Sequence, residues 1–392
     1  MSVLNSRPVL RWLVPASAAL AVIGGGAAIG ALTAAADPSL QPRSAAQLLV
    51  DVQTARLDGL SGTVVQRADL GLPALPNVGG QGSSDLTSLV SGTHTLRVWY
   101  SGPDQARVAL LGTLGETDVI TNGRDLWIWS SRENKATHRT LPADDAAKAI
   151  PTPSAGALTP ELLANAVLAA IEPTTAVTTD GSATVAGRDA YELILAPRDK
   201  ASLVGSVRLA IDATEHVPLR VQVYARDGGD PAIEVAFTQV SFARPNPEQF
   251  VFNPPPGATV VEEGTGTARS EPAKPDASKP DATKPDATKP DKAEPGVAVI
   301  GKGWTSVLVA RVPEQPADDK ANAKSDQGKG LGDFTAILEK LPKVSGTWGT
   351  GHVLTSRLFS VLLTDDGRIL IGAVSPERLY QAAADPAAKL GG

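Results

Sequence analysis

The sequence predicts a mainly β, α+β protein, with a large antiparallel sheet followed by a smaller α+β domain. Three observations support this class. Short runs of β-branched and aromatic residues, such as HTLRVWYSG and TDVITNG, follow one another closely between turn residues, as in an antiparallel meander. Apolar residues at helical spacing occur in only a few segments. A repeat of Lys-Pro-Asp separates the C-terminal part from the rest.

The first helix is expected to begin at Ser44. A serine at this position can cap a helix, and Leu48, Leu49, Val52 and Leu57 follow it at helical spacing. A second helix is expected within 142–173, where Thr159-Pro160-Glu161 supplies a cap, a proline at the first helical position and an acidic first turn. The stretch ELLANAVLAAI then continues with an apolar stripe.

Strands account for most of the remaining sequence before the repeat. A Gly/Pro/Ser-rich insertion at 71–91 interrupts the first group, and the helical segment separates the two groups. Alternation along SVRLAID, with Val207, Leu209 and Ile211 in phase, indicates a half-buried strand. The expected strands are 61–70, 94–102, 105–112, 117–123, 125–131, 136–140, 187–197, 206–212, 218–225 and 232–242.

Two tryptophans lie on a strand whose two faces are both apolar. Asn122-Gly123 is a strong hairpin signal, so Trp127 and Trp129 are expected on one face of the returning strand and Leu126/Ile128 on the other. A two-residue turn would place Trp127 opposite Asp118, whereas a three-residue loop would place it near Thr117. A sheet with one face in water would be apolar on one side only, so something must cover the second face.

The N-terminus predicts export. Arg7 and Arg11 precede an uncharged run from Trp12 to Ala36, long enough for a membrane anchor, while Ala34 to Ala36 offers a signal cleavage site. Residues 1–36 are therefore expected to be a cleaved signal peptide or a retained anchor in the cytoplasmic membrane. In either case, residues after 36 should lie outside that membrane.

Composition excludes some classes of partner and indicates where the chain divides into domains. The net charge is −6 and cysteine is absent, so nothing indicates nucleic-acid binding, a thiol nucleophile or a disulfide framework. The Lys-Pro-Asp repeat lies within a proposed linker at 262–296, which lacks the large apolar residues needed for a core. Such a proline-rich segment acts as a semi-rigid spacer. It divides a domain at 37–261 from a domain at 297–392, and the two are expected to move independently.

The C-terminal domain is expected to be small and α+β. A strand at 307–312 precedes a polar loop at 313–330 and a helix capped by Asp333. RLFSVLLTDDGRILIGAV is a predicted hairpin that turns at Asp366-Gly367. A last helix should begin after Ser375, which is followed by Pro376 at the first helical position.

Catalytic chemistry is not indicated. The histidines, His94, His138, His216 and His352, show no metal-ligand spacing, and His138 is expected at an edge or on the surface. The glycine-rich stretch from Gly346 to His352 lacks the lysine of a phosphate-binding loop and is predicted to be a turn. The sequence therefore favours a non-enzymatic protein with no cofactor and no metal.

Four stretches resemble the LolA/LolB/RseB superfamily of extracytoplasmic lipoprotein-carrier folds across 44–261. In order, they are VITNGRDLWIWSSRENKATHR, GRDAYELILAPRD, VRLAIDATEHVPLRVQVYARDG and FVFNPPPGATVV. The resemblance implies an incomplete antiparallel barrel, closed by helices, whose apolar cavity accepts acyl chains. Residues 297–392 resemble the small C-terminal domain of RseB (MucB) regulators in element order.

Two functions therefore remain open: an extracytoplasmic carrier or sensor of a lipid or lipoprotein acyl chain, and an RseB-like regulator whose C-terminal domain binds an anti-sigma factor or other membrane protein. Aromatics at period two are ordinarily core residues. Given the resemblance, either Trp127/Trp129 or Leu126/Ile128 should face the cavity and the other set the outer or lid-covered side, and the tryptophans are favoured because a wide cavity accepts bulky rings. The predicted cavity wall consists of Trp99, Trp127, Trp129, Tyr191, Leu193, Leu195, Leu209, Ile211, Val221, Val223 and Phe237.

Overall fold

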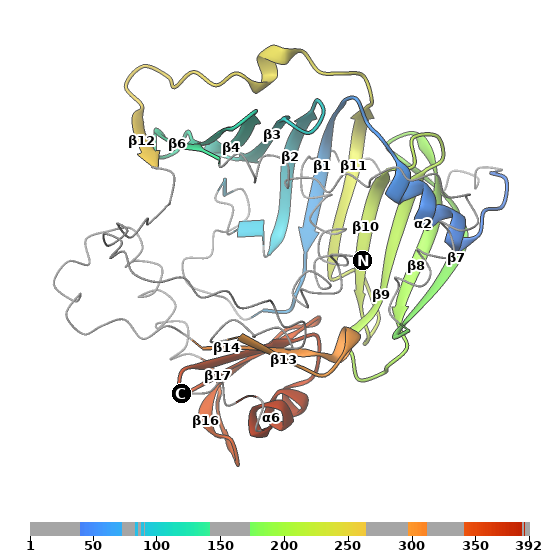
Figure 1. The fold of residues 1–392 in the computed structure, drawn as a ribbon, viewed down its shortest axis with the longest axis vertical. Coiled ribbons are helices and arrows are strands. Elements are labelled where there is room, and N and C mark those ends of the chain that lie inside the picture. Colours follow the sequence, from blue (N-terminus) through green and yellow to red (C-terminus); the bar gives the residue numbers. More distant parts are fainter. Residues whose placement is uncertain are drawn as a thin grey trace, which may run out of the picture.

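The computed structural model describes residues 40–72, 83–84, 88–89, 91–141, 173–263, 297–311, 341–385 and 388. They form a twelve-stranded sheet and, below it in Figure 1, a six-stranded sheet. The predicted mainly β, α+β class is confirmed. The predicted signal or anchor, the helix at 159–171, nearly all of the linker and nearly all of the helix after Asp333 lie outside the described residues. Within the described part, no helix has the length and apolarity needed to cross a membrane.

The large sheet is open, with β12 and β7 at its edges. Two meanders, β1 to β6 and β7 to β11, are joined where β1 pairs with β11. All pairs are antiparallel except β12 with β6. The strands are β1 Leu60–Ala68, β2 Gly92–Tyr100, β3 Gln105–Gly112, β4 Gly115–Asn122, β5 Asp125–Ser130, β6 Lys135–Thr140, β7 Thr175–Val185, β8 Arg188–Pro197, β9 Val204–Asp212, β10 Pro218–Ala225, β11 Ile233–Ser241 and β12 Thr259–Glu263.

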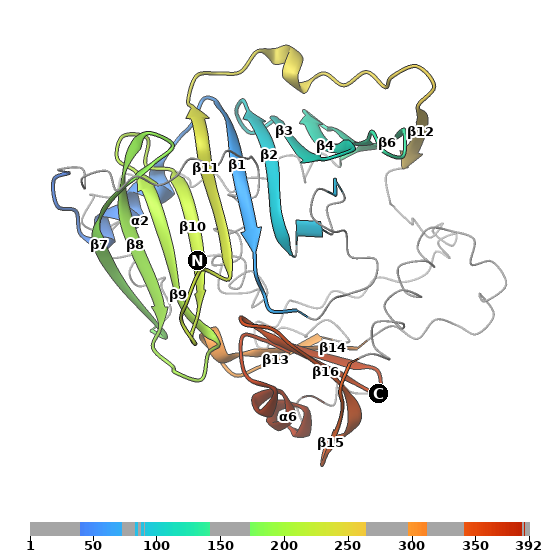
Figure 2. The same ribbon diagram turned by 180° about the vertical axis from the view of Figure 1, so that it is seen from behind.

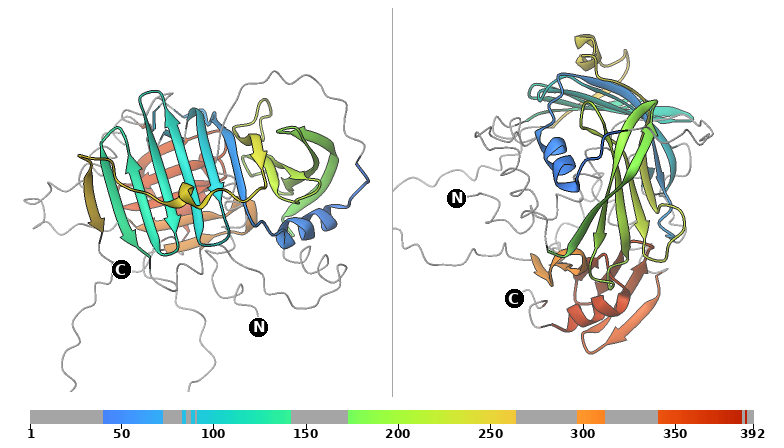
Figure 3. Two further views of the ribbon diagram at one scale, coloured as in Figure 1. Left: turned by 90° about the horizontal axis from the view of Figure 1, so that it is seen from above. Right: turned by 90° about the vertical axis from the view of Figure 1, so that its right-hand side faces the viewer.

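Helix α2, Ala45–Thr54, packs on β7 and β8 at the curled end of this sheet (Figure 3). The start predicted at Ser44 is confirmed: the Ser44 side chain accepts a hydrogen bond from the backbone of Gln47, and the Gln47 side chain accepts one from the backbone of Ser44. This reciprocal capping satisfies two otherwise unpaired donors. The helix buries Leu48 and Val50.

The β4–β5 hairpin corrects one sequence prediction. Asn122 pairs with Asp125, so the loop consists of Gly123 and Arg124 rather than Asn122 and Gly123. Gly123 has φ of 62°, which suits glycine at the first loop position of a two-residue hairpin. Trp127 consequently lies opposite Ile120, and neither pairing predicted for it is found.

A long connection after β11 crosses one face of the large sheet. Residues 242–258, here the crossing segment, include the short helix η4 (Pro247–Phe250) and lead to β12 on the far edge. Figures 1 and 2 show the segment passing over the strands β1 to β6. Helix η4 contacts β3 and β4. The crossing segment is the cover that the second apolar face of β5 requires.

The small sheet has the order β13-β14-β18-β17-β16-β15. Helix α6, Pro376–Ala384, covers one face and begins at the predicted position. Val307, Val309, Leu362, Leu370 and Leu379 form the core between them. The predicted turn at Gly346–His352 is the β15–β16 turn and the start of β16. The strands are β13 Val297–Ile300, β14 Val307–Arg311, β15 Lys343–Gly346, β16 Gly349–Thr355, β17 Ser360–Thr364 and β18 Arg368–Gly372.

The two sheets are in contact, contrary to the expectation of independent movement. The Arg357 side chain donates hydrogen bonds to the carbonyl oxygens of Gly228 (3.0 Å) and Asp230 (3.1 Å), and Trp304 Nε1 donates to Thr175 Oγ1 (2.8 Å). An apolar cluster lies beside these bonds. Its buried members are Leu70, Val204, Ala225, Ala232 and Leu358. A spacer sequence shows only that the domains could separate, and not whether their surfaces attract each other.

Candidate ligand-binding face

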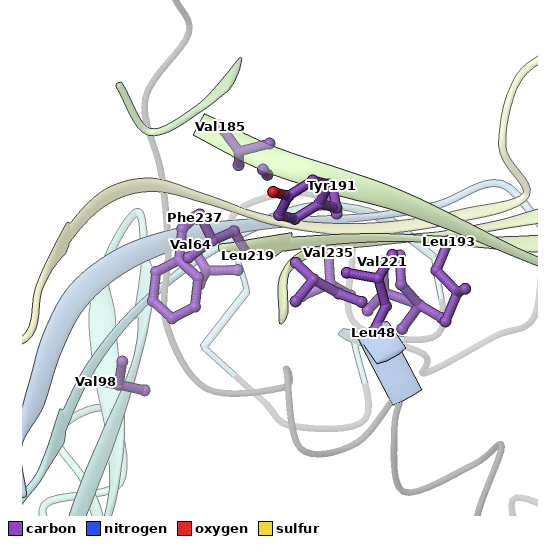
Figure 4. Close-up of a cluster of buried hydrophobic side chains, with 14 residues drawn as sticks. Leu48, Val64, Val98, Val185, Tyr191, Leu193, Leu219, Val221, Val235 and Phe237 are labelled. Carbon is purple, nitrogen blue, oxygen red and sulfur yellow. The ribbon is translucent and has the colours of Figure 1, made fainter. Parts of the chain in front are cut away.

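Eight of the eleven predicted cavity residues share the face of the large sheet that carries α2, here the α2 face. In the strand registers Tyr191 lies opposite Ile211, and Leu193 lies opposite Leu209. Most of the eight form one apolar cluster with Leu48 of α2 (Figure 4). The eight are Tyr191, Leu193, Leu195, Leu209, Ile211, Val221, Val223 and Phe237.

At this curled end the α2 face is a packed core. Leu193 and Ile211 are each 1% exposed, and Val221 is 2% exposed. Leu195 and Val223 are only half-buried. Val223 also contacts the apolar cluster between the two sheets. The core under α2 is therefore continuous with the contact between the domains.

The three tryptophans lie on the opposite face, here the outer face. Trp99 lies opposite Arg107 and Trp129 opposite Asp118, whereas Val98, the neighbour of Trp99, points into the α2-face cluster. The prediction that Trp127 and Trp129 occupy a different face from Leu126 and Ile128 is confirmed. The prediction that the tryptophans share one wall with the other eight residues is wrong, because strand parity places them on the other side of the sheet.

The crossing segment closes the outer face with aromatic rings. Phe250 is 1% exposed. The ring of Phe252 lies 5.2 Å from that of Trp127 and 5.9 Å from that of Trp129, within the range of favourable aromatic pairs. Trp129 is 7% exposed. The outer face is thus a core made by the chain itself rather than an open cavity.

A buried ion pair lies on the same outer face. Arg107 Nε donates to Asp118 Oδ1 at 2.8 Å, and the Asp118 side chain is 1% exposed. The guanidinium also lies 5.2 Å from the Trp99 ring. Its Nη1 donates to the carbonyl of Gln249 in the crossing segment at 3.5 Å. Arg107 therefore links three strands of the sheet to their cover.

The α2 face of β2 to β5 carries a row of aliphatic residues that becomes more exposed along the sheet. Val98 lies opposite Val108, Val108 opposite Val119, and Val119 opposite Ile128. Val98 is 6% exposed, the two central valines are half-buried and Ile128 is 38% exposed. Val98, Val108 and Val119 were not predicted as site residues. Ile128 belongs to the alternative set, Leu126/Ile128, which was considered for the cavity but not favoured.

An open cleft of about 870 Å³ lies beside the start of α2, between the N-terminal arm and the β7–β8 and β9–β10 turns. The Tyr191 hydroxyl donates to the carbonyl of Gln41 at 3.1 Å, which holds the arm against β8. Arg43 pairs with Asp51, and Arg188 donates two hydrogen bonds to Asp212. Burial opposes ionisation of Asp212, but the bonds from Arg188 and two backbone amides keep its pKa below the ordinary value. Because both arginines are already paired, the cleft has no marked preference for anions.

The described histidines do not form a reactive centre. His94 contacts the carbonyl of Ser91 and His352 contacts that of Leu341, while His216 lies in a turn at φ of 59°. Among the described residues, no group of three or more His, Cys, Asp or Glu side chains is arranged to hold a metal ion. His138 is different, because both of its ring nitrogens contact carboxylates.

Residues 130–254 match the family model of the MucB/RseB N-terminal domain. This match confirms the LolA/LolB/RseB resemblance seen in the sequence. The chain is similar to MucB in the Pseudomonas aeruginosa MucA/MucB complex, at 19% identity over 87% of this chain and 96% of that one, with a TM-score of 0.41. It is also similar to a LolA superfamily protein from Nitrosomonas europaea, at 13% identity over 54% of this chain and 99% of that one, with a TM-score of 0.21. No curated protein matches the chain.

Proposed function

We propose that this chain is an extracytoplasmic binding protein that holds the acyl chain of a lipid or lipoprotein against the α2 face of a half-barrel. One observation carries the proposal: the apolar row extends over four successive strands, and only its Val98 end is fully buried. Contiguous apolar surface of this kind is usually covered by a partner or a ligand.

The chemistry of the row fits an acyl chain better than a polar ligand. Apolar contact is non-directional and stabilises roughly in proportion to the area removed from water, so aliphatic side chains suffice for a flexible hydrocarbon. The row continues through Val98 into the packed cluster under α2, which contains Val64 and Phe237. We place the eight α2-face residues at the closed end of the binding region and the apolar row at its accessible end.

A matched pair of glutamate substitutions tests this function. Ile128→Glu puts a carboxylate on the row, and Leu114→Glu puts one on a residue that is 90% exposed in the β3–β4 turn. Burying an unpaired carboxylate against hydrocarbon is costly, so Ile128→Glu should weaken binding of a fluorescent fatty acid by about tenfold or more. Leu114→Glu should bind like the wild type. Equal binding by all three proteins would reject the proposed site.

Ligand identity requires a separate measurement. Solvent extraction of the purified exported chain, followed by mass spectrometry, should release a lipid or lipoprotein acyl species. Ile128→Glu should release less of it than Leu114→Glu. Export itself rests on Arg7 and Arg11 before an apolar run, and a C-terminal reporter active only in the cytoplasm would contradict it.

A second function, regulation through a protein partner, is favoured by the small sheet. On the face opposite α6, Val299 lies opposite Leu308, which lies opposite Ile371. These residues are 38%, 39% and 37% exposed. We propose this face as the surface for a membrane-protein partner such as an anti-sigma factor. A photo-crosslinking residue at Leu308 should capture that protein, and one at exposed Gln381 on α6 should not.

A further inference from the structure

His138 joins three elements at the edge of the large sheet. It lies on β6, and its ring stacks on Trp127 of β5 with 4.2 Å between centroids and 17° between planes. Its Nε2 lies 3.0 Å from Asp125 Oδ1 on β5. Its Nδ1 lies 2.8 Å from Glu262 Oε2 on β12. One imidazole therefore contacts a carboxylate on each side.

The two contacts determine the protonation state of the ring. An ionised carboxylate only accepts hydrogen bonds, so both ring nitrogens must carry a proton, as they do only in the imidazolium. A neutral imidazole has one N–H and would turn a lone pair toward one of the two carboxylates. We propose that His138 is a pH-sensitive latch, which holds β12 on the sheet as an imidazolium and releases it when the proton is lost.

The structure indicates that Glu262 is the contact that yields. Asp125 belongs to β5, which pairs with β4 on one side and β6 on the other. Among the described strands β12 pairs with β6 alone, and all five of its residues are exposed. A short exposed edge strand opens at low free-energy cost. A second side-chain tie of β12 is the Arg139–Glu263 pair at 2.6 Å, which does not involve His138.

The surrounding charges favour the imidazolium. Partial burial lowers the pKa of His138, but the hydrogen bonds and charges of Glu262 and Asp125 outweigh it and raise the pKa above the ordinary value. Trp127 and Phe252, which pack nearby, carry no charge. The charged groups on its own strand and on adjacent elements are Asp125 on β5, Arg124 in the β4–β5 turn, Lys135 and Arg139 on β6, and Glu262 and Glu263 on β12.

The sign of the effect follows from the raised pKa. The latch stabilises docked β12 fully below about pH 6.5, the ordinary pKa of histidine. This stabilisation is lost as the pH rises through the higher pKa that His138 has in the folded protein. Release of β12 would uncover the edge of β6. Because the predicted linker at 262–296 begins within β12, release would also lengthen the tether to the C-terminal domain.

Hydrogen exchange of the full chain tests the latch. The protection of the β12 amides, corrected for the intrinsic pH dependence of exchange, should fall about two- to fivefold as the pH rises from 6 to 9. His138→Gln should abolish this dependence, since glutamine does not titrate. Glu262→Gln should lower the pKa of His138 measured by NMR. The matched control is Glu263→Gln, which should weaken protection without moving the pH midpoint.

Two results would overturn the latch. One is a His138 that titrates at or below about pH 6.5, because the carboxylates would then not favour the imidazolium. The other is β12 protection that falls with pH equally in the wild type and in His138→Gln. A folding defect in His138→Gln would be recognised from its circular dichroism, and Glu262→Gln then provides the same test through the midpoint.

Discussion

The two faces of β2 to β5 are both apolar, but they are completed in different ways. On the outer face, Trp127 and Trp129 contact Phe252, and Trp129 is 7% exposed. On the α2 face, the apolar row ends at Ile128, which is 38% exposed. One strand, β5, therefore presents a closed core on one side and accessible apolar surface on the other.

The difference shows that the size of a side chain does not distinguish a core from a binding surface. The larger residues, the tryptophans, lie where the chain covers itself, because a packed interior gains most from large rings in fixed contact. The smaller valines and isoleucine lie on the more accessible face. What separates the two faces is the crossing segment at 242–258, which is distant in sequence from the strands it covers.

The largest expected effect is that of Trp129→Ala. Truncation of a large aromatic side chain in a packed core costs about 3–5 kcal/mol of unfolding free energy, and here it also removes the contact with Phe252. Urea denaturation should show this loss, while the affinity for a fluorescent fatty acid stays unchanged. A small loss of stability together with weaker fatty-acid binding would instead show that Trp129 is part of the ligand-binding site.

Sequence reasoning found the strands and the parity of the large sheet but assigned the faces incorrectly. Alternation within DLWIWS shows that two faces exist, and it carries no information on which distant segment packs against each. The sequence FVFNPP was recognised as a closing motif, although its position over the tryptophans depends on long-range contacts. The missed strands β7, β12, β13, β15 and β16 are short, edge-located or rich in threonine and glycine, so their period-two signal is short or weak.

Arg107→Met tests the polar part of the same outer face. The substitution leaves Asp118 buried without its cationic partner, which typically costs about 3–5 kcal/mol. Thermal or urea unfolding at pH 7 should show a loss of unfolding free energy near the lower end of this range, because the Arg107 side chain is 25% exposed. The matched control is Arg97→Met, an exposed arginine on the same face of β2, which should change stability by less than about 0.5 kcal/mol.

The contact between the sheets marks a second limit of sequence reasoning. The Lys-Pro-Asp repeat lies in the sequence between β12 and β13, and its composition predicts reach rather than docking. The interface depends on Arg357 donating to the backbone carbonyls of Gly228 and Asp230. Every residue has a backbone carbonyl, whatever its side chain. The contact of Arg357 with these two carbonyls therefore could not be predicted from residue types.

The smallest effect is expected on the α2 face, from Val119→Ala. Val119 is half-buried, whereas its neighbour Ile120 points to the outer face and is 1% exposed. Loss of two partly buried methyl groups should cost about 1 kcal/mol, while Ile120→Ala should cost about 2–5 kcal/mol. Unfolding in urea compares the two variants directly.

Saturating fatty acid stabilises only a protein that binds it in the folded state, so Val119→Ala should lose part of that stabilisation and Arg97→Met should keep it. Equal costs for Val119→Ala and Ile120→Ala without ligand would show that both faces of β4 are ordinary core, and the acyl-binding proposal would lose its basis.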